Sequence, residues 1–267
     1  AALYSTTDLA TISERVTKYN PDIMIYITDK RQAMHFEQVF RCARKTKLVG
    51  DDTKLVHIGF GTVNGKDGKP FKTRDGGVPR LENLIHDIDE EMFRKIVESR
   101  QEMPEEEARN IAEIVGLAAI KYGDLSNQAA KDYSFDVDRF TSFEGDTGPY
   151  ILYTIVRIKS ILERYREEGR NPEEGTMLQP ANASEKALML ELSRFNSVIA
   201  PAFEEKAPHK ICSYIYDLAN AFNSFYHETK ILSEENEAQK TSWIRLLVLA
   251  RDVLETCIDL LGFEAPE

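Results

Sequence analysis

Two short apolar runs near the start of the chain constrain its fold more than any other feature. They cover residues 23–27 and 55–60, are apolar on both faces, and are separated by a helical pattern over residues 31–44. Such runs are typical of buried strands in a parallel sheet, in which a helix connects each strand to the next. Another helical pattern precedes the first run, so the order helix, strand, helix, strand predicts half of a doubly wound α/β unit.

The beginning of such a unit is missing from the sequence. The first helical pattern starts almost at once, with Thr6 or Thr7 as its expected cap. A doubly wound nucleotide-binding fold normally opens with a strand and a phosphate-binding turn, and neither precedes this helix. We therefore expect the chain to be a fragment of a larger protein.

After residue 80 the strand patterns give way to helical ones. Periodic apolar residues predict helices over residues 80–99, 105–125, 147–167, 184–203, 208–228 and 237–261. Residues 133–145 are irregular and rich in Phe, as expected for a junction. The sequence therefore predicts an α/β domain, the second half of a Rossmann-type fold with its connecting helices, over residues 1–134, followed by an α-helical bundle over residues 135–267.

Composition and charge exclude several classes of protein. The 267 residues are 42% apolar and 30% charged, which is typical of a soluble globular protein, and no apolar run reaches membrane-spanning length. A formal net charge of −11 means that any RNA would have to meet a local basic face. The three cysteines and five histidines lack metal-ligand spacing, so we expect reduced thiols, a cytoplasmic protein and no structural metal.

A loop rich in glycines and cations follows the second strand pattern. Six of the chain's 14 glycines lie between residues 59 and 77, together with Lys66, Lys69, Lys72 and Arg74. Backbone N–H groups freed by glycine, beside mobile cations, suit phosphate oxygens. The Asn-Gly and Asp-Gly pairs of the same segment equally suit the turns of an exposed β-hairpin. No Walker pattern is present, so composition leaves both interpretations open.

The helical pattern over residues 147–167 has two distinct faces. One is an apolar stripe, and the nearly opposite one carries Tyr150, Tyr153, Arg157 and Arg164. Exposed tyrosines backed by arginines can stack unpaired bases and neutralise phosphates. Alternatively, the tyrosines pack against another helix and the arginines pair with neighbouring glutamates, and spacing alone favours this packing interpretation. The apolar stripe consists of Ile151, Ile155, Ile158 and Leu162.

Three segments, taken in order, resemble the arginyl-tRNA synthetases, a family of class I aminoacyl-tRNA synthetases. The first combines residues 4–10 (YSTTDLA) with residues 31–36 (RQAMHF), the second is residues 68–77 (GKPFKTRDGG), and the third is residues 143–153 (FEGDTGPYILY). The last residues, 260–267 (LLGFEAPE), are similar to the family as well. The resemblance thus extends over essentially the whole chain.

The resemblance implies ATP-dependent activation of arginine, followed by its transfer to the 3′ end of tRNA(Arg). An arginine pocket needs an acid for the guanidinium, and the matching residues assign that task to Asp8. By the same resemblance Tyr4 covers the substrate and Gln32 orients its amino-acid end. His35, one helical turn from Gln32, is expected to reach the nucleotide or else to be a structural helix histidine.

The second segment resembles the family's form of the class I signature loop, which stabilises the departing pyrophosphate. By this resemblance Lys72 and Arg74 are the catalytic residues, and Lys69, Lys72 and Arg74 bind ATP, with Mg²⁺ expected beside it. The loop departs from the common Lys-Met-Ser-Lys-Ser pattern, because Pro70 and Thr73 occupy the positions of its two lysines.

The third segment resembles the start of the family's anticodon-binding domain. This favours Tyr150, Tyr153 and Arg157 as contacts for the anticodon loop of tRNA. Asp146 stands where the family usually has asparagine, so a polar contact there is expected to be altered. The implied partners are arginine, ATP and tRNA(Arg), with no membrane, and the full-length enzyme is expected to be a monomer.

The class I His-x-Gly-His signature belongs before Tyr4 and is absent from these residues. The resemblance therefore implies that this chain alone does not form arginyl-adenylate. A noncatalytic RNA-binding helical module that keeps the tRNA face is an alternative. A helical interaction protein with a purely structural glycine loop is a third.

Overall fold

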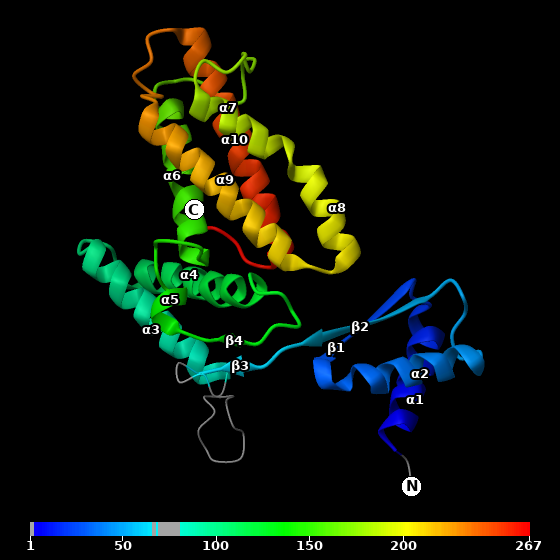
Figure 1. The fold of residues 1–267 in the computed structure, drawn as a ribbon. Coiled ribbons are helices and arrows are strands. Elements are labelled where there is room, and N and C mark those ends of the chain that lie inside the picture. The colour runs from blue at the N-terminus through cyan, green and yellow to red at the C-terminus, as the bar shows by residue number, and fades with distance from the viewer. Residues whose placement is uncertain (1–2, 66–67, 69–80) are drawn as a thin grey trace. The chain divides into compact units, whose positions relative to one another are not determined.

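The computed structural model describes residues 3–65, 68 and 81–267, and the chain divides into two compact units. The first unit comprises Ala1–Phe71 and Ala129–Phe135, and the second comprises Lys72–Gln128 and Asp136–Glu267. Figure 1 shows both units, with the elements labelled in chain order. None of the helices in the described ranges is long and apolar enough to cross a membrane.

The first unit confirms the predicted order of helix, strand, helix, strand. Strands β1 and β2 pair in parallel, with Ile23 opposite Lys54 and Asp29 opposite Phe60. Parallel strands need a crossover connection, and α2 supplies it. The elements are α1 (Tyr4–Tyr19), β1 (Ile23–Asp29), a 3₁₀ helix η1 (Lys30–Gln32), α2 (Ala33–Lys45), β2 (Lys54–Phe60), β3 (Val63–Asn64) and β4 (Tyr133–Ser134).

The core of the first unit lies on one face of the β1–β2 sheet. Met24 and Tyr26 of β1 pack with Ile12 of α1 and with residues of α2 on that face. The alternate residues Ile25 and Ile27 are 43% and 65% exposed. The prediction that this strand is buried on both faces is therefore wrong for the described residues, because both neighbouring helices contribute to the same side.

The prediction that Thr6 or Thr7 caps the first helix is also wrong. Leu3 occupies the N-cap position and α1 begins at Tyr4, before either threonine. The Thr6 hydroxyl accepts a hydrogen bond from the backbone N–H of Leu3 at 3.4 Å, and the Thr7 hydroxyl donates to the carbonyl of Tyr4 at 2.7 Å. Both threonines thus satisfy backbone groups from inside the first turn rather than in front of it.

A later segment of the chain returns to complete the first unit. The Asp132 carboxylate accepts hydrogen bonds from Lys30 Nζ at 2.8 Å and from the backbone N–H of Thr62 at 2.7 Å. Strands β3 and β4 pair in parallel beside this contact. A Cβ atom on Gly61 would lie 2.2 Å from the carbonyl oxygen of Lys131, so close approach of the two backbones explains this glycine.

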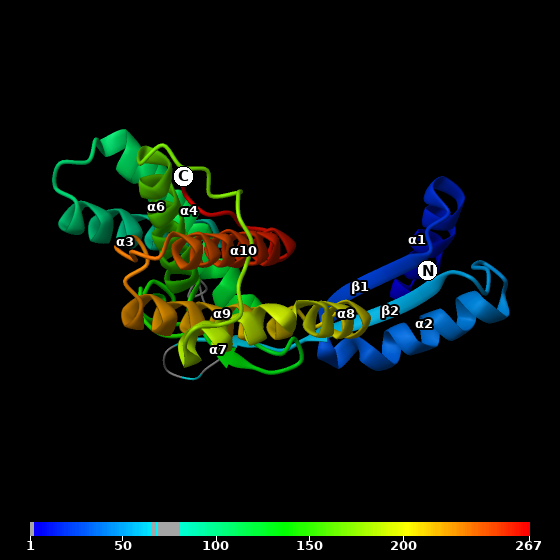
Figure 2. The ribbon, with the colours of Figure 1, turned by 90° about the horizontal axis from the view of Figure 1, so that it is seen from above.

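In the second unit, all the secondary structure that the structure describes is helical. Helices α3 and α4 pack together, α4 packs against α6, and α9 contacts α6, α7, α8 and α10. Figures 1 and 2 show α9 running beside α10. The helices are α3 (Leu81–Ser99), α4 (Glu105–Leu125), α5 (Val137–Phe140), α6 (Gly148–Glu167), α7 (Ala183–Ser193), α8 (Phe195–Glu205), α9 (Pro208–Glu228) and α10 (Glu237–Leu261).

Two of the elements predicted from the sequence differ from those in the structure. The helix predicted over residues 184–203 is two helices, α7 and α8, because the chain bends at Arg194, where ψ is −11°. This bend allows both short helices to pack on α9. The junction predicted as irregular contains β4 and the one-turn helix α5, which are too short to produce a recognisable apolar period.

The apolar stripe predicted for α6 is buried in the second unit. Ile151, Ile155, Ile158 and Leu162 are all fully buried. Thr147 caps this helix by accepting a hydrogen bond from the N–H of Tyr150 at 3.2 Å, and Pro149 follows in the first turn, where its missing N–H costs nothing.

Gly148 lies where the start of α6 packs directly on the backbone of α4. A Cβ atom there would lie 2.3 Å from the carbonyl oxygen of Ala118, and backbone atoms cannot move aside cheaply. Gly148→Ala is therefore expected to lower the free energy of unfolding by about 2–3 kcal/mol. Urea denaturation followed by circular dichroism measures it, and Gly50→Ala, which places nothing within 4 Å of the new Cβ, is the control. Equal stabilities for the two variants would contradict the packing argument.

Buried thiols and phenols make the second unit sensitive to alkali. Burial raises the pKa of Cys257 to about 12, and it also raises the pKa of Cys212, Tyr122 and Tyr214, with the Asp146 carboxylate contributing to the shifts of Cys212 and Tyr122. In the unfolded chain thiols ionise near pH 9 and phenols near pH 10, so above those values the unfolded state binds fewer protons than the folded one.

Stability is therefore expected to be fully present below about pH 9 and to fall above it, by about 1.4 kcal/mol per pH unit for each group that ionises on unfolding. Urea midpoints measured from pH 8 to pH 10.5 test this sign. Cys257→Ala should flatten the dependence, because one ionising thiol is removed. A constant free energy of unfolding over that range would contradict the expectation.

Candidate functional site

Four of the residues singled out in the sequence lie on elements around the carboxyl end of β1. The 3₁₀ helix η1 follows β1 directly and leads into α2, and a contact between Asp8 and His35 brings α1 beside the first turn of α2. Tyr4 and Asp8 lie on α1, Gln32 ends η1, and His35 lies in the first turn of α2. The crevice beyond the carboxyl ends of parallel strands is the usual place for ligands in such sheets.

The closest contact in this group joins Asp8 and His35. Asp8 Oδ2 and His35 Nε2 are 2.6 Å apart, and both side chains are about one third exposed (28% and 34%). This contact fixes the orientation of the carboxylate and leaves its second oxygen, Oδ1, without a partner among the described residues. An oriented and accessible carboxylate of this kind can accept two hydrogen bonds from a planar cation.

Tyr4 and Gln32 lie one helical turn from that pair. Tyr4 precedes Asp8 by four residues on α1 and its side chain is 87% exposed. Gln32 precedes His35 by three residues and makes no side-chain hydrogen bond as N-cap of α2. Residues spaced by three or four share one side of a helix, so Tyr4 lies on the side of α1 that carries Asp8, and Gln32 lies one turn before His35. Lys69, Lys72 and Arg74 lie outside the described residues.

His57 is a neighbour that the sequence did not indicate. Its Nε2 lies 2.8 Å from the hydroxyl of Thr28, and its ring stacks on Phe36 with centroids 5.0 Å apart. The ring thereby ties β2 to the end of β1 and to α2. Only the parallel register of β1 and β2 brings Thr28 and His57 together, and the sequence shows no periodic signal for it.

A second group lies where α6 meets α9 in the second unit. Arg157 Nη1 donates to Asn223 Oδ1 at 2.6 Å, Asn223 Nδ2 donates to the Tyr150 hydroxyl at 2.9 Å, and that hydroxyl donates to Asn220 Oδ1 at 2.7 Å. The Tyr150 ring also packs edge-on against Tyr216. The hydroxyl and ring of Tyr150 thus bind to α9, as the packing interpretation expects for this residue.

Arg157 and Tyr153 are arranged differently from Tyr150. Arg157 Nη2 donates to the Tyr153 hydroxyl at 2.9 Å, and its guanidinium carbon lies 4.6 Å from the Tyr153 ring centroid and 5.1 Å from that of Tyr226. The two tyrosines remain 48% and 37% exposed. The result is a guanidinium held against two accessible rings, which we call the Arg157 cluster, comprising Tyr153, Arg157, Asn223 and Tyr226.

Sequence reasoning missed two members of this cluster. Asn223 and Tyr226 are one turn apart on α9, but their neighbours across the interface depend on the register of α9 against α6. The packing interpretation expected the arginines of α6 to pair with neighbouring glutamates. Arg157 instead donates to Asn223 and Tyr153, whereas Arg166, which is not one of the arginines singled out, pairs with Glu163 at 3.0 Å.

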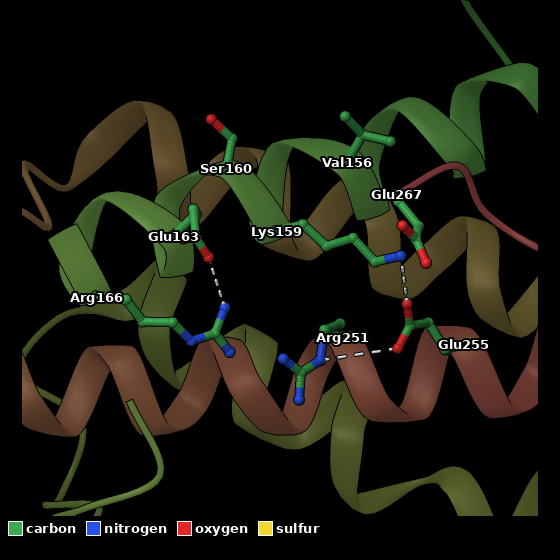
Figure 3. Close-up of a pocket in the computed structure, with 8 residues that line it drawn as sticks. All are labelled: Val156, Lys159, Ser160, Glu163, Arg166, Arg251, Glu255 and Glu267. Atoms are coloured by element: carbon green, nitrogen blue, oxygen red, sulfur yellow. Dashed lines mark hydrogen bonds and ion pairs between the residues drawn. The ribbon is translucent and has the colours of Figure 1, made fainter. Parts of the chain in front are cut away.

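A charged groove of about 460 Å³ runs between α6 and α10 (Figure 3). Lys159 pairs with Glu255 at 2.9 Å, and Arg251 lies 3.8 Å from the same carboxylate. Arg166 pairs with Glu163, as described above. Because each of these cations already faces a carboxylate, the groove offers little uncompensated positive charge to a polyanion.

Asp146, which stands where the family usually has asparagine, is hydrogen-bonded to Tyr122 of α4. The hydroxyl of Tyr122 donates to Asp146 Oδ1 at 2.5 Å, and the carbonyl oxygen of Cys212 lies 2.9 Å from the same hydroxyl. Burial, followed by the Asp146 charge, raises the pKa of Tyr122 far above its usual value, so the phenol stays protonated as a donor. Asp146 thus joins the start of α6 to α4.

Comparisons with known proteins match both parts of the chain. Residues 1–137 match the family described as "tRNA synthetases class I (R), catalytic domain", and residues 151–267 match the "DALR anticodon binding domain". The arginine–tRNA ligases of Agathobacter rectalis and Alkaliphilus oremlandii are 64% and 59% identical to this chain. Each match covers 100% of this chain but only 46% and 45% of the relative, so the chain spans less than half the length of these relatives.

Solved structures agree with these matches. Arginyl-tRNA synthetase from Plasmodium falciparum superposes with a TM-score of 0.83 at 30% identity, covering 99% of this chain and 44% of that one. The arginyl-tRNA synthetase of Thermus thermophilus gives 0.84 at 25% identity, covering 100% and 49%. The predicted fold class, part of a class I catalytic domain followed by a helical anticodon-binding domain, is confirmed.

Proposed function

The chain belongs to the class I arginyl-tRNA synthetase family, and from that premise we propose that it is part of an arginine–tRNA ligase, which activates arginine with ATP and transfers it to the 3′ end of tRNA(Arg). The observation that carries this proposal is the order of the two family matches, a catalytic segment over residues 1–137 and an anticodon-binding segment over residues 151–267. In this proposal residues 1–134 belong to the catalytic domain and residues 135–267 read the tRNA.

The arginine site of the proposal is built on Asp8. Its free Oδ1 and its oriented Oδ2 suit the two parallel N–H donors of a guanidinium, and His35 holds the carboxylate in place at 2.6 Å. Tyr4, which is largely exposed, would close over the substrate, and the amide of Gln32 would orient its amino-acid end. The guanidinium is always charged, so a carboxylate distinguishes it from neutral side chains of similar length.

The proposed ATP-binding residues are assigned mainly from the resemblance to the family, because three of the four lie outside the described residues. We propose that His35 lies near ATP and that Lys69, Lys72 and Arg74 stabilise the charge of the departing pyrophosphate. Mg²⁺ typically binds nucleotide phosphates with only one or two carboxylates from protein. The described part of the chain contains no group of three or more His, Cys, Asp or Glu side chains that could hold a metal ion.

The Arg157 cluster is the proposed contact for the anticodon loop. Two accessible tyrosine rings can stack on unpaired bases, and the guanidinium beside them can meet a phosphate or a base edge. Tyr150 would support this surface from beneath through its hydrogen bonds to Asn223 and Asn220. The cluster supplies local positive charge in a chain whose formal net charge is −11.

Assays of tRNA binding and pyrophosphate exchange by the isolated chain test the proposed function. We expect the chain to bind tRNA(Arg) with an affinity that falls as salt rises, and to show no arginine-dependent exchange of pyrophosphate into ATP. Filter binding and radiolabel exchange measure the two properties, with a noncognate tRNA as control. Absence of tRNA binding by the folded chain would refute the proposed function, and detectable exchange would refute the expected inactivity. A noncatalytic RNA-binding module would also bind tRNA, so exchange by the full-length protein decides between the two.

A further inference from the structure

The ring of Phe36 lies between two histidine rings in the first unit. His57 stacks on it, with ring centroids 5.0 Å apart and planes 12° apart. His35 meets it edge-on, with centroids 5.3 Å apart and planes 82° apart. Phe36 itself is only 4% exposed. Stacked and edge-to-face pairs at these separations are favourable arrangements of aromatic rings, so the three side chains form a packed series, which we call the ring series.

A hydrogen bond ties each end of the ring series to a different element. At one end His57 Nε2 lies 2.8 Å from the hydroxyl of Thr28, close to the carboxyl end of β1. At the other end His35 Nε2 lies 2.6 Å from Asp8 Oδ2 on α1. A carboxylate only accepts hydrogen bonds, so His35 Nε2 is the donor to Asp8. The ring series therefore connects the two strands to the carboxylate of the proposed arginine site.

The orientation of each ring in the series depends on its neighbours. The χ2 torsion of a phenyl or imidazole ring has a broad energy minimum, so packing decides where such a ring rests. Tyr26 and Phe40 also contact the Phe36 ring, with centroids 5.2 Å and 5.9 Å away, and both belong to the packed core. His57 covers a face of the same ring from β2. Loss of His57 would uncover that face, and His35 would lose a neighbour that is fixed in position.

We propose that His57 is a positioning residue for arginine binding, which acts through Phe36 and His35 on the carboxylate of Asp8. The proposal rests on the proposed function, because it takes Asp8 to bind the guanidinium of the substrate. A paired contact between a carboxylate and a planar guanidinium requires the two groups to be aligned, so a carboxylate that is free to rotate binds the guanidinium less tightly. His57 exerts this effect without touching the substrate.

The test uses the full-length synthetase and steady-state exchange of pyrophosphate into ATP, measured over a range of arginine and then of ATP concentrations. His57→Ala should raise the KM for arginine by about fivefold, while kcat and the KM for ATP change by less than about twofold. His57→Phe restores a ring that can stack on Phe36, and it should return the KM for arginine to within about twofold of the unaltered enzyme. If His57→Ala does not fold, His57→Gln, which also lacks the ring, takes its place with the same expected result.

A double-mutant cycle with His35 distinguishes positioning from a general weakening of the fold. If His57 acts through His35, His57→Ala should change the KM for arginine by less than about twofold in an enzyme that already carries His35→Ala. Val39→Ala is the matched control, because it removes a buried side chain from α2, the helix that carries Phe36 and His35. It should lower the melting temperature and leave the KM for arginine within about twofold of the unaltered enzyme.

The results distinguish a failure of this proposal from a failure of the proposed function. If the enzyme is active and His57→Ala leaves the KM for arginine unchanged, or raises the KM for ATP equally, His57 does not position the arginine site. If His57→Phe is impaired as much as His57→Ala, the stacked ring is not what matters. If the effects of His57→Ala and His35→Ala multiply in the double variant, His57 does not act through His35. If the unaltered full-length protein shows no arginine-dependent exchange, the proposed function itself fails.

Discussion

Replacing Asp8 by asparagine in the full-length synthetase is expected to raise the KM for arginine by about 100-fold, while the KM for ATP changes little. Asparagine keeps the size of the side chain and can still accept the hydrogen bond from His35 Nε2, now at 2.6 Å from Asp8 Oδ2. What it removes is the negative charge that is proposed to face the guanidinium of the substrate. Steady-state exchange of pyrophosphate into ATP, measured over a range of arginine concentrations, gives both constants.

Two further variants serve as comparisons for Asp8→Asn. Asp51→Asn removes an exposed carboxylate from the turn before β2 and should leave both constants within twofold of the unaltered enzyme. His35→Ala keeps the charge of Asp8 but releases its orientation, so a smaller rise in the KM for arginine is expected. If Asp8→Asn had no larger effect than Asp51→Asn, Asp8 would not contact the substrate.

Replacing Arg157 by alanine is expected to weaken tRNA binding by about 30-fold. The guanidinium is within 4.6 Å and 5.1 Å of two tyrosine centroids and donates to Asn223 at 2.6 Å. Its loss removes a cation from the surface and also frees Tyr153 and Asn223, which it orients. Filter binding of tRNA(Arg) to the isolated chain at fixed salt measures the change.

Arg166→Ala is the matched control, since it removes an arginine from the same helix that already pairs with Glu163 at 3.0 Å. It should change the affinity by less than threefold, because exposed ion pairs contribute little. Arg157→Lys keeps the charge and loses the planar fork, so an intermediate loss is expected. Equal effects of Arg157→Ala and Arg166→Ala would mean that only overall charge matters.

Local pattern was enough to predict most of the helices and the fold class. Apolar residues at helical spacing placed α3, α4, α6, α9 and α10 to within about two residues, because that spacing is a property of one helix and its buried side. The two apolar runs gave β1 and β2, and their parallel pairing followed from the helix between them. The motifs of residues 4–10, 31–36, 68–77 and 143–153 were sufficient to identify the family, which the comparisons confirm.

The tertiary structure decided which faces meet, because a period states that a side is buried without saying against what. The apolar run predicted that Ile25 and Ile27 are buried. Both are exposed, because α1 and α2 pack on the opposite face of the sheet. The division of α7 from α8 depends on packing against α9, and β3 and β4 exist only because residues 129–135 return to the first unit.

The candidate sites show the same division between sequence and structure. The family resemblance singled out Asp8, Gln32 and His35 as candidate site residues, whereas the 2.6 Å contact that orients Asp8 depends on how α1 packs beside the start of α2. The sequence also singled out Arg157 as a candidate, but its partners Asn223 and Tyr226 are set by the register of α9 against α6. Residue types and local periods are written along the chain, and contacts between elements arise only when long-range packing fixes their relative position.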